Sequence, residues 1–151
     1  MTSTVTETLL RRLAGFRAAN GCAVTVYVDL DPSSTPTASD VDTKFNAVLS
    51  GAEKAAEARA DDRDCRLALR DDLERIRSWW AADFDRDGAR GVAVFASSAD
   101  GFFETLPLAR AAGDDAWIGA GFRISPLVSQ LGRDGDLVAV VSRVRGTVYR
   151  L

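Results

Sequence analysis

Apolar residues recur along the chain at two spacings, one typical of helices and the other of strands. Helical stretches place apolar side chains three or four residues apart, whereas strand stretches are short, β-branched and bounded by turn residues. A dense run of charges at residues 57–64 indicates a bend or break within a long helical region. The pattern predicts helices at residues 6–19, 40–82 and 127–131, and strands at residues 23–30, 91–96, 102–106, 117–124, 137–141 and 147–151. We therefore expect an α/β fold, with a mixed β-sheet of about four to five strands packed by helices.

The run at residues 22–32, C-A-V-T-V-Y-V-D-L-D-P, predicts a buried central strand that ends in two carboxylates and a proline. Ligands of open α/β sheets bind at the carboxyl ends of strands, which makes Asp29 and Asp31 candidate binding residues. One residue separates them, so an extended strand would carry both on the same face. Two interpretations stay open. One is a site for a metal or small molecule, and the other is a turn in which Asp31 accepts hydrogen bonds from nearby backbone N–H groups.

The composition is that of a soluble globular domain. The 151 residues are 46% hydrophobic and 27% charged, which provides enough apolar material for one core. The net charge of −3 argues against a strongly basic nucleic-acid surface, and no DNA partner is expected. No apolar run approaches the roughly 18 residues that a membrane span needs, and the first residues lack the features of a signal peptide. We expect a cytoplasmic protein with no membrane partner.

Side chains that commonly perform catalysis are scarce. The chain has no histidine, which removes the commonest general base and the commonest metal ligand. Its two cysteines, Cys22 and Cys65, show no metal-binding or redox spacing and are expected to be reduced, buried thiols. Asp83, Asp85 and Asp87 begin like a calcium-binding loop, but the twelfth position falls in a predicted strand, which favours a solvated turn. No cofactor, metal or catalytic residue is predicted.

Aromatic and basic residues provide further candidate contacts. Trp79 and Trp80 end the long helical region, and adjacent helical positions point about 100° apart. Trp80 is a candidate for stacking on a nucleotide base or a partner protein, with packing against the core as the alternative. Arg143 and Arg145 make the last predicted hairpin locally basic. They are candidate contacts for RNA phosphate, although charges on edge strands also keep proteins soluble.

Several segments, taken in order, carry a family resemblance that covers nearly the whole chain. They are L-L-R-R-L-A-G-F-R at residues 9–17, V-T-V-Y-V-D-L-D-P at 24–32, A-R-G-V-A-V-F-A-S at 89–97, G-F-F-E-T-L-P-L at 101–108, F-R-I-S-P-L-V-S-Q-L at 122–131 and L-V-A-V-V-S-R-V-R-G-T-V-Y-R-L at 137–151. In this order and spacing they resemble the amino-terminal part of the bacterial proteins related to archaeal and eukaryotic class 1 peptide-chain release factors and to Pelota.

The resemblance implies a protein of three domains. Its first domain is α/β, and its middle domain carries, in many members, a Gly-Gly-Gln tripeptide that promotes peptidyl-tRNA hydrolysis. Residues 1–136 are then expected to form the release-factor-like N-terminal domain, and residues 137–151 the opening hairpin of a truncated middle domain. No Gly-Gly-Gln occurs in the chain, so it is not expected to be an enzyme by itself. The implied partners of the full-length protein are the ribosome and tRNA.

Release factors read stop codons with the motif T-A-S-N-I-K-S, and residues 37–43 of this chain spell T-A-S-D-V-D-T. Asp40 stands in place of the asparagine and Asp42 in place of the lysine, and a carboxylate repels RNA phosphate where a lysine attracts it. The second codon-reading motif, Y-x-C-x-x-x-F, is absent too. Asp40 and Asp42 stay candidate binding residues, but stop-codon reading is not expected. The similarity also fits a helix start at which Ser39 or Asp40 accepts from free backbone N–H groups.

Three functions stay open at this point. The first is a non-catalytic N-terminal recognition domain of a release-factor-like, ribosome-associated protein that acts in translation termination, rescue or hibernation. The second is a small-molecule or metal-binding α/β domain that uses Asp29 and Asp31. The third is a stress-linked protein-interaction module, which fits the acidic balance of charges.

Overall fold

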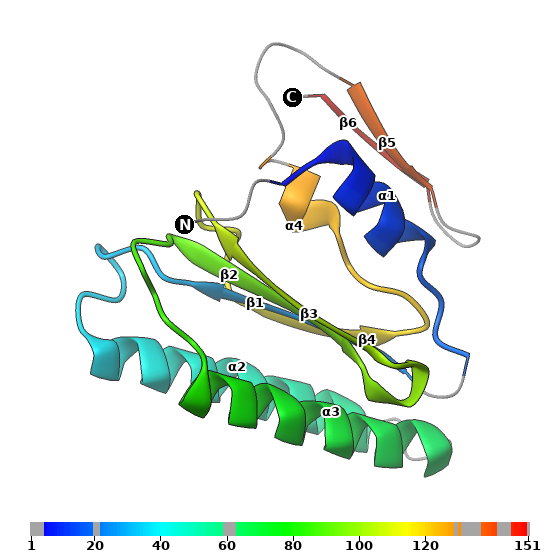
Figure 1. Ribbon diagram of the computed structural model, residues 1–151, viewed down its shortest axis with the longest axis horizontal. Coiled ribbons are helices and arrows are strands. Elements are labelled where there is room, and N and C mark those ends of the chain that lie inside the picture. The colour runs from blue at the N-terminus through cyan, green and yellow to red at the C-terminus, as the bar shows by residue number, and fades with distance from the viewer. Residues whose placement is uncertain are drawn as a thin grey trace.

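A four-stranded sheet, a separate hairpin and helices on both faces of the sheet make up the described part of the chain (Figure 1). The structure is a computed structural model that describes residues 5–19, 22–58, 63–128, 130, 137–141 and 146–150. The helices are α1 (Glu7–Gly15), α2 (Ala38–Glu57), α3 (Arg63–Ala82), the short 3-10 helix η1 (Ser98–Asp100) and α4 (Ser125–Val128). The strands are β1 (Ala23–Asp29), β2 (Gly91–Ser97), β3 (Phe102–Leu108), β4 (Asp115–Gly119), β5 (Leu137–Val141) and β6 (Gly146–Arg150).

The sheet has the strand order β3-β2-β1-β4, and each of its described pairings is antiparallel. The expected α/β class and the sheet of four strands packed by helices are confirmed, but the sheet is antiparallel where we expected a mixed one. The reason lies in the connection between β1 and β2. Because α2 and α3 have 20 residues each, the chain travels about 30 Å along one helix and returns along the next. It therefore enters β2 at the end of the sheet where it left β1, which makes the two strands antiparallel.

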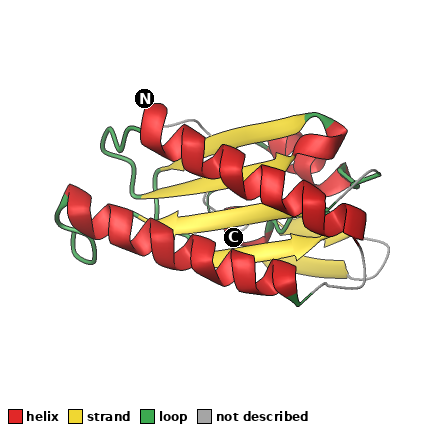
Figure 2. Cartoon of the chain, turned by 90° about the horizontal axis from the view of Figure 1, so that it is seen from below, coloured by secondary structure: helices red, strands yellow, loops and turns green. Residues whose placement is uncertain are grey.

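Helices cover both faces of the sheet, so β1 is buried at nearly every position. Val24, Val26 and Val28 belong to the core cluster formed with α2 and α3. Ala23 and Tyr27 point to the opposite face, where they pack with residues of α1 and α4. Figure 2 shows α2 and α3 side by side across their face of the sheet. Burial on both faces explains the continuous apolar run of β1, which a sheet with one solvated face would not need.

Each long helix turns one apolar stripe toward the sheet. The buried residues are Val41, Phe45, Leu49 and Ala52 in α2, and Cys65, Ala68, Leu69, Asp72, Leu73 and Ile76 in α3. The break expected from the charged run at residues 57–64 is confirmed, since α2 ends at Glu57 and α3 begins at Arg63. The predicted 40–82 region is therefore two amphipathic helices that form a helical hairpin.

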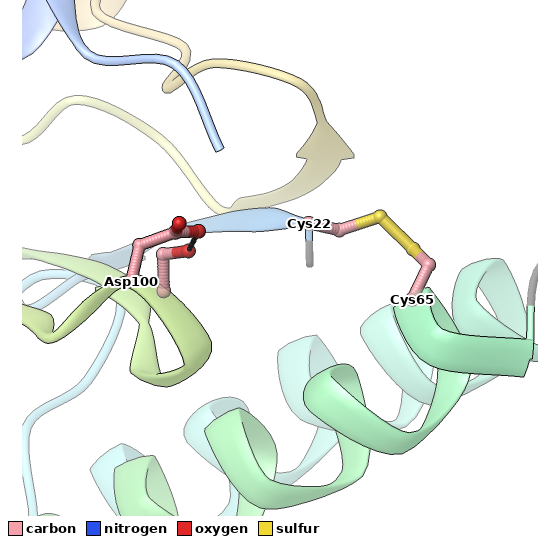
Figure 3. Close-up of a disulfide and its surroundings, with 4 residues drawn as sticks. Cys22, Cys65 and Asp100 are labelled. Carbon is pink, nitrogen blue, oxygen red and sulfur yellow. Dashed lines mark hydrogen bonds between the residues drawn. A yellow bond between two sulfur atoms is a disulfide. The ribbon is translucent and has the colours of Figure 1, made fainter. Parts of the chain in front are cut away.

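Cys22 and Cys65 form a disulfide, so the expectation of two reduced thiols is wrong (Figure 3). Cys22 lies directly before β1, and Cys65 lies in the first turn of α3. The fold brings their Cα atoms to 5.3 Å, within the range that a disulfide spans. The two residues are 43 positions apart, and the contact depends on how α3 crosses the sheet, which the spacing of the cysteines does not reveal.

Several ends of the elements differ from the sequence predictions. β4 begins at Asp115 and ends at Gly119, earlier than the predicted 117–124. α4 begins at Ser125, two residues before the predicted 127–131, and the predicted end at residue 131 lies outside the described residues. The predicted last hairpin is confirmed as β5 paired with β6. In Figure 1 this hairpin lies on the side of the sheet that carries α1 and α4. Its assignment to a following domain stays a prediction.

Candidate functional site

At the carboxyl end of β1, Asp29 is engaged by neighbouring residues. Its Oδ1 accepts a hydrogen bond from the Asp31 N–H at 2.8 Å, and its own N–H donates to Asp114 Oδ1 at 2.7 Å. Lys44 Nζ lies 3.9 Å from Asp29 Oδ2 and 3.3 Å from Asp114 Oδ2. The Lys44 ammonium thus offsets both carboxylates and connects α2 to the ends of β1 and the β3–β4 loop. Asp29 has a structural role here.

Asp31 lies in the turn after β1, and so does not share a strand face with Asp29. Its carboxylate accepts from the Ser33 N–H at 2.9 Å and from Ser33 Oγ at 2.7 Å, and Arg90 Nη1 lies 3.3 Å away. The hydrogen bonds from Ser33, followed by the charge of Arg90, lower the pKa of Asp31. This geometry supports the turn interpretation. It gives no support to a metal or small-molecule site, and no group of three potential metal ligands lies together among the described residues.

Asp40 and Asp42 both take part in local contacts at the start of α2. Thr37 is the N-cap, in place of the expected Ser39 or Asp40, because its backbone is the extended one before the first helical turn. Thr37 Oγ1 accepts from the Asp40 N–H at 3.1 Å, and Asp40 Oδ2 accepts from the Thr37 N–H at 3.1 Å, which is a capping box. Asp42 Oδ1 accepts from Trp80 Nε1 at 2.8 Å. The match to the codon-reading motif is thus a helix start.

Trp80 is the middle ring of an aromatic stack. The rings of Phe45 and Phe84 each lie 3.8 Å from its ring, and both are within 7° of parallel. Two rings cannot occupy the same place above one indole, so they cover opposite faces of Trp80. Trp79 packs edge-on against Phe84 at 5.7 Å. Both faces of Trp80 are occupied within the chain, which favours the packing interpretation over stacking on a base.

The other residues singled out from the sequence fall into a loop and an undescribed segment. In the loop between α3 and β2, Asp85 Oδ1 accepts from the Asp87 N–H at 3.1 Å, and Asp87 and Gly88 have positive φ angles of 39° and 74°. The loop therefore forms a tight turn, as expected. Arg143 and Arg145 lie outside the described residues.

Arg86, which the sequence analysis did not single out, connects the same loop to the turn after β1. Its Nη1 donates to the Thr35 carbonyl at 2.8 Å, and its Nη2 donates to the Leu30 carbonyl. Thr35 and Leu30 are both buried, so the guanidinium satisfies two acceptors that water does not reach. The signal for such a role is a lone arginine among aspartates in a loop, which sequence alone does not distinguish from a solvated charge.

Asp72 is a fully buried carboxylate of α3 and faces η1. Its Oδ1 accepts from the Ser98 N–H at 2.6 Å, whereas its Oδ2 and Ser98 Oγ have no hydrogen-bond partner among the described residues. Burial raises the pKa of Asp72, and the hydrogen bond from the Ser98 N–H offsets part of that shift. The contact holds the start of η1 against α3, which is a structural role.

A groove of about 490 Å³ lies between α2 and α3 and contains the basic residues that sequence analysis missed. Arg63, Arg66 and Arg70 follow one another along α3 at helical spacing. Each is exposed, and none makes an ion pair or hydrogen bond with another residue in the described ranges. Arg77, further along the groove, pairs with Glu53 of α2. We call this surface the α2–α3 groove.

The spacing of these arginines was visible in the sequence, but their location was not. Arg63 falls within the charged run interpreted as a break, and Arg66 and Arg70 stand among acidic neighbours. The net charge of −3 also argues against a basic surface, although it does not show how the charges are distributed over the fold. Only the path of α3 beside α2 shows that one face of the helix gathers the arginines beside a groove.

Comparison with known proteins adds to the fold and not to the function. No protein-family model and no curated protein matches the chain. A solved structure described as "Archaeal protein" is similar, with a TM-score of 0.52 and 13% sequence identity. The similarity covers 97% of this chain and 44% of the other, so this chain spans less than half the length of that protein. At this identity the similarity shows the fold alone.

None of the helices in the described ranges is both long and apolar enough to cross a bilayer.

Proposed function

We propose that this chain is a non-catalytic recognition domain of a release-factor-like, ribosome-associated protein. The observation that supports this function is the α2–α3 groove, where Arg63, Arg66 and Arg70 make no ion pair with another described residue. In contrast, Asp29 and Asp31, the candidate binding residues at the end of β1, are engaged in turn hydrogen bonds and ion pairs. Unpaired arginines in the groove, together with carboxylates already paired at the end of β1, favour binding over catalysis.

The test is sedimentation of the purified chain with purified bacterial ribosomes. We expect co-sedimentation at about 50 mM salt that weakens at about 200 mM, because arginine contacts with phosphate or carboxylate are screened and compete with salt ions. Arg66→Glu and Arg70→Glu, made singly, should each reduce co-sedimentation. Lys54→Glu is the matched control, since it makes the same charge change on α2 at an exposed position outside the groove.

Two results would contradict this function. Absence of co-sedimentation at low salt, with all three variants folded by circular dichroism, would exclude a stable ribosome contact through this chain. An equal effect of Lys54→Glu and Arg66→Glu would show a response to net charge and not a site.

A protein-interaction module is the second candidate function, because an apolar side chain lies exposed in the same groove. Leu67 is 48% exposed, and Trp117 is the other large hydrophobic residue exposed among the described ones. Contiguous apolar surface rimmed by polar residues marks protein-binding sites, and Leu67 lines the groove together with Leu73 and Ala56.

A further inference from the structure

The α2–α3 groove combines an apolar floor with a basic rim. Leu73 of α3 and Ala56 of α2 line it, together with the exposed Leu67. On α3, Leu67 lies four residues after Arg63 and three before Arg70, so the leucine and both arginines share one face of the helix. A ligand that fills the groove would meet apolar surface and guanidinium groups at once.

The charges in the groove favour an acidic ligand. Glu53 is already paired with Arg77, which leaves two carboxylates, those of Glu57 and Glu74, facing the unpaired arginines. Glu57 ends α2, and Glu74 lies one turn beyond Arg70, so both stand at the borders of the basic stretch. Between them the arginines present planar guanidinium groups that bind carboxylates with two parallel hydrogen bonds.

Leu67 decides between two acidic ligands, an RNA strand and a peptide. A phosphodiester backbone can pair with arginines, but it offers no aliphatic group to cover a leucine that is 48% exposed. A peptide can supply carboxylates and an apolar side chain within a few residues. Protein interfaces combine an apolar centre with a polar rim, and aromatic residues and arginine are enriched among the residues that carry most of the binding energy.

We infer that the α2–α3 groove docks an acidic peptide segment of a partner protein, with an apolar side chain of that segment placed on Leu67 and its carboxylates paired with Arg63, Arg66 and Arg70. This inference rests on the recognition function, but it does not require that the partner belong to the ribosome.

The experiment measures the binding of three fluorescein-labelled probes to the full chain by fluorescence anisotropy at about 50 mM salt. The first probe is a short peptide in which glutamates surround one central phenylalanine. The second is the same peptide with serine at the central position, and the third is a single-stranded oligouridylate. Each probe is measured with the unchanged chain and with Leu67→Ser, Arg66→Glu and the control Lys54→Glu.

The phenylalanine peptide is expected to bind at least about tenfold more tightly than the serine peptide, because full burial of an aromatic side chain is worth at least that factor. Leu67→Ser should lower the affinity for the phenylalanine peptide by at least about threefold, since only the exposed half of the leucine is newly buried on binding. It should leave the serine peptide unchanged. Arg66→Glu should weaken the binding of both peptides. Lys54→Glu should weaken the binding of each peptide less than Arg66→Glu does.

Equal affinity for the two peptides, no binding of either, or an unchanged affinity in Leu67→Ser would overturn the inference. Tighter binding of oligouridylate than of the phenylalanine peptide, lost in Arg66→Glu, would make the groove a nucleic-acid site. Leu67 is half exposed, so its replacement should leave the melting temperature close to that of the unchanged chain, and this is measured alongside. Ribosome co-sedimentation without peptide binding would reject the inference and keep the proposed function. Peptide binding without ribosome co-sedimentation would keep the inference and reject the ribosome as the partner.

Discussion

Removal of the Cys22–Cys65 disulfide should lower the stability of the fold by several kcal/mol. The bond joins the start of the central strand to the first turn of α3, and both cysteines are buried. It therefore restrains the unfolded chain over a closed loop that contains α2 and the helical connection. The change is made in two ways, by reduction of the unchanged protein and by the double substitution Cys22→Ala with Cys65→Ala.

The expected size follows from the sequence separation of 43 residues. Closing a loop of that length removes conformational entropy from the unfolded chain that corresponds to about 4 kcal/mol at 25 °C. For a domain of this size, each kcal/mol moves the melting temperature by roughly 2–4 °C. Reduction should therefore lower the melting temperature by roughly 8–16 °C.

Urea unfolding followed by circular dichroism, with and without a dithiol reductant, measures the change. Reduction should destabilise the unchanged protein and leave the double-alanine variant unaffected, so the variant serves as the control for effects of the reductant. Thiol titration of the unfolded, non-reduced protein should find no free thiol. Detection of two thiols there, or a loss of less than about 1 kcal/mol on reduction, would refute the reasoning.

Two further predictions concern buried polar contacts. Asp72→Asn keeps the acceptor for the Ser98 N–H but removes a buried charge. Since burial raises the pKa of Asp72 in the folded state, the stability of the unchanged protein should fall as pH rises from the unfolded pKa near about 3.9 through the raised folded pKa. Melting temperatures measured across this window should show that fall in the unchanged protein and not in Asp72→Asn, and parallel curves would contradict the assignment. Arg86→Ala leaves the buried carbonyls of Leu30 and Thr35 without a donor, which should cost about 2–3 kcal/mol in urea unfolding. Arg86→Lys keeps the charge but loses the two separate nitrogens that donate to the Leu30 and Thr35 carbonyls. Full stability in that variant would show that the contact with both carbonyls is unimportant.

Periodicity predicted the long helices because each buries one face in the core, and it predicted the central strands because both of their faces are buried. The stripe that contains Phe45 and Leu49 in α2, and the apolar run of β1, are direct consequences of burial. Periodicity does not determine strand direction. The charged run at residues 57–64 was enough to predict a break, but it does not show that the two helices have equal length and so return the chain to the end of the sheet where β1 ends.

The contacts that sequence missed each depend on residues far apart in the chain. The Cys22–Cys65 bond needs the crossing of α3 over the start of β1, and the Arg86 contact needs a loop to meet the turn after β1. The predicted N-cap of α2 was wrong as well, since Thr37 and not Ser39 or Asp40 caps the helix. Residues 37–43 offer several hydroxyl and carboxylate groups in a row, and only the backbone conformation decides which of them is the cap.

The antiparallel sheet also explains why the end of β1 lacks the arrangement of strands on which the predicted ligand site depends. The rule that ligands bind at the carboxyl ends of strands holds for parallel sheets, in which neighbouring strands bring several such ends to one edge. Here both strands next to β1 begin where it ends, with Asp29 paired to Gly91 of β2 and Tyr27 paired to Asp115 of β4, so no neighbouring strand ends beside it. The carboxylates of Asp29 and Asp31 instead hold the turn that leads into α2, and Lys44 of α2 lies against Asp29. They position the helical hairpin whose outer surface carries the unpaired arginines, which moves the expected place of recognition from the edge of the sheet to the α2–α3 groove.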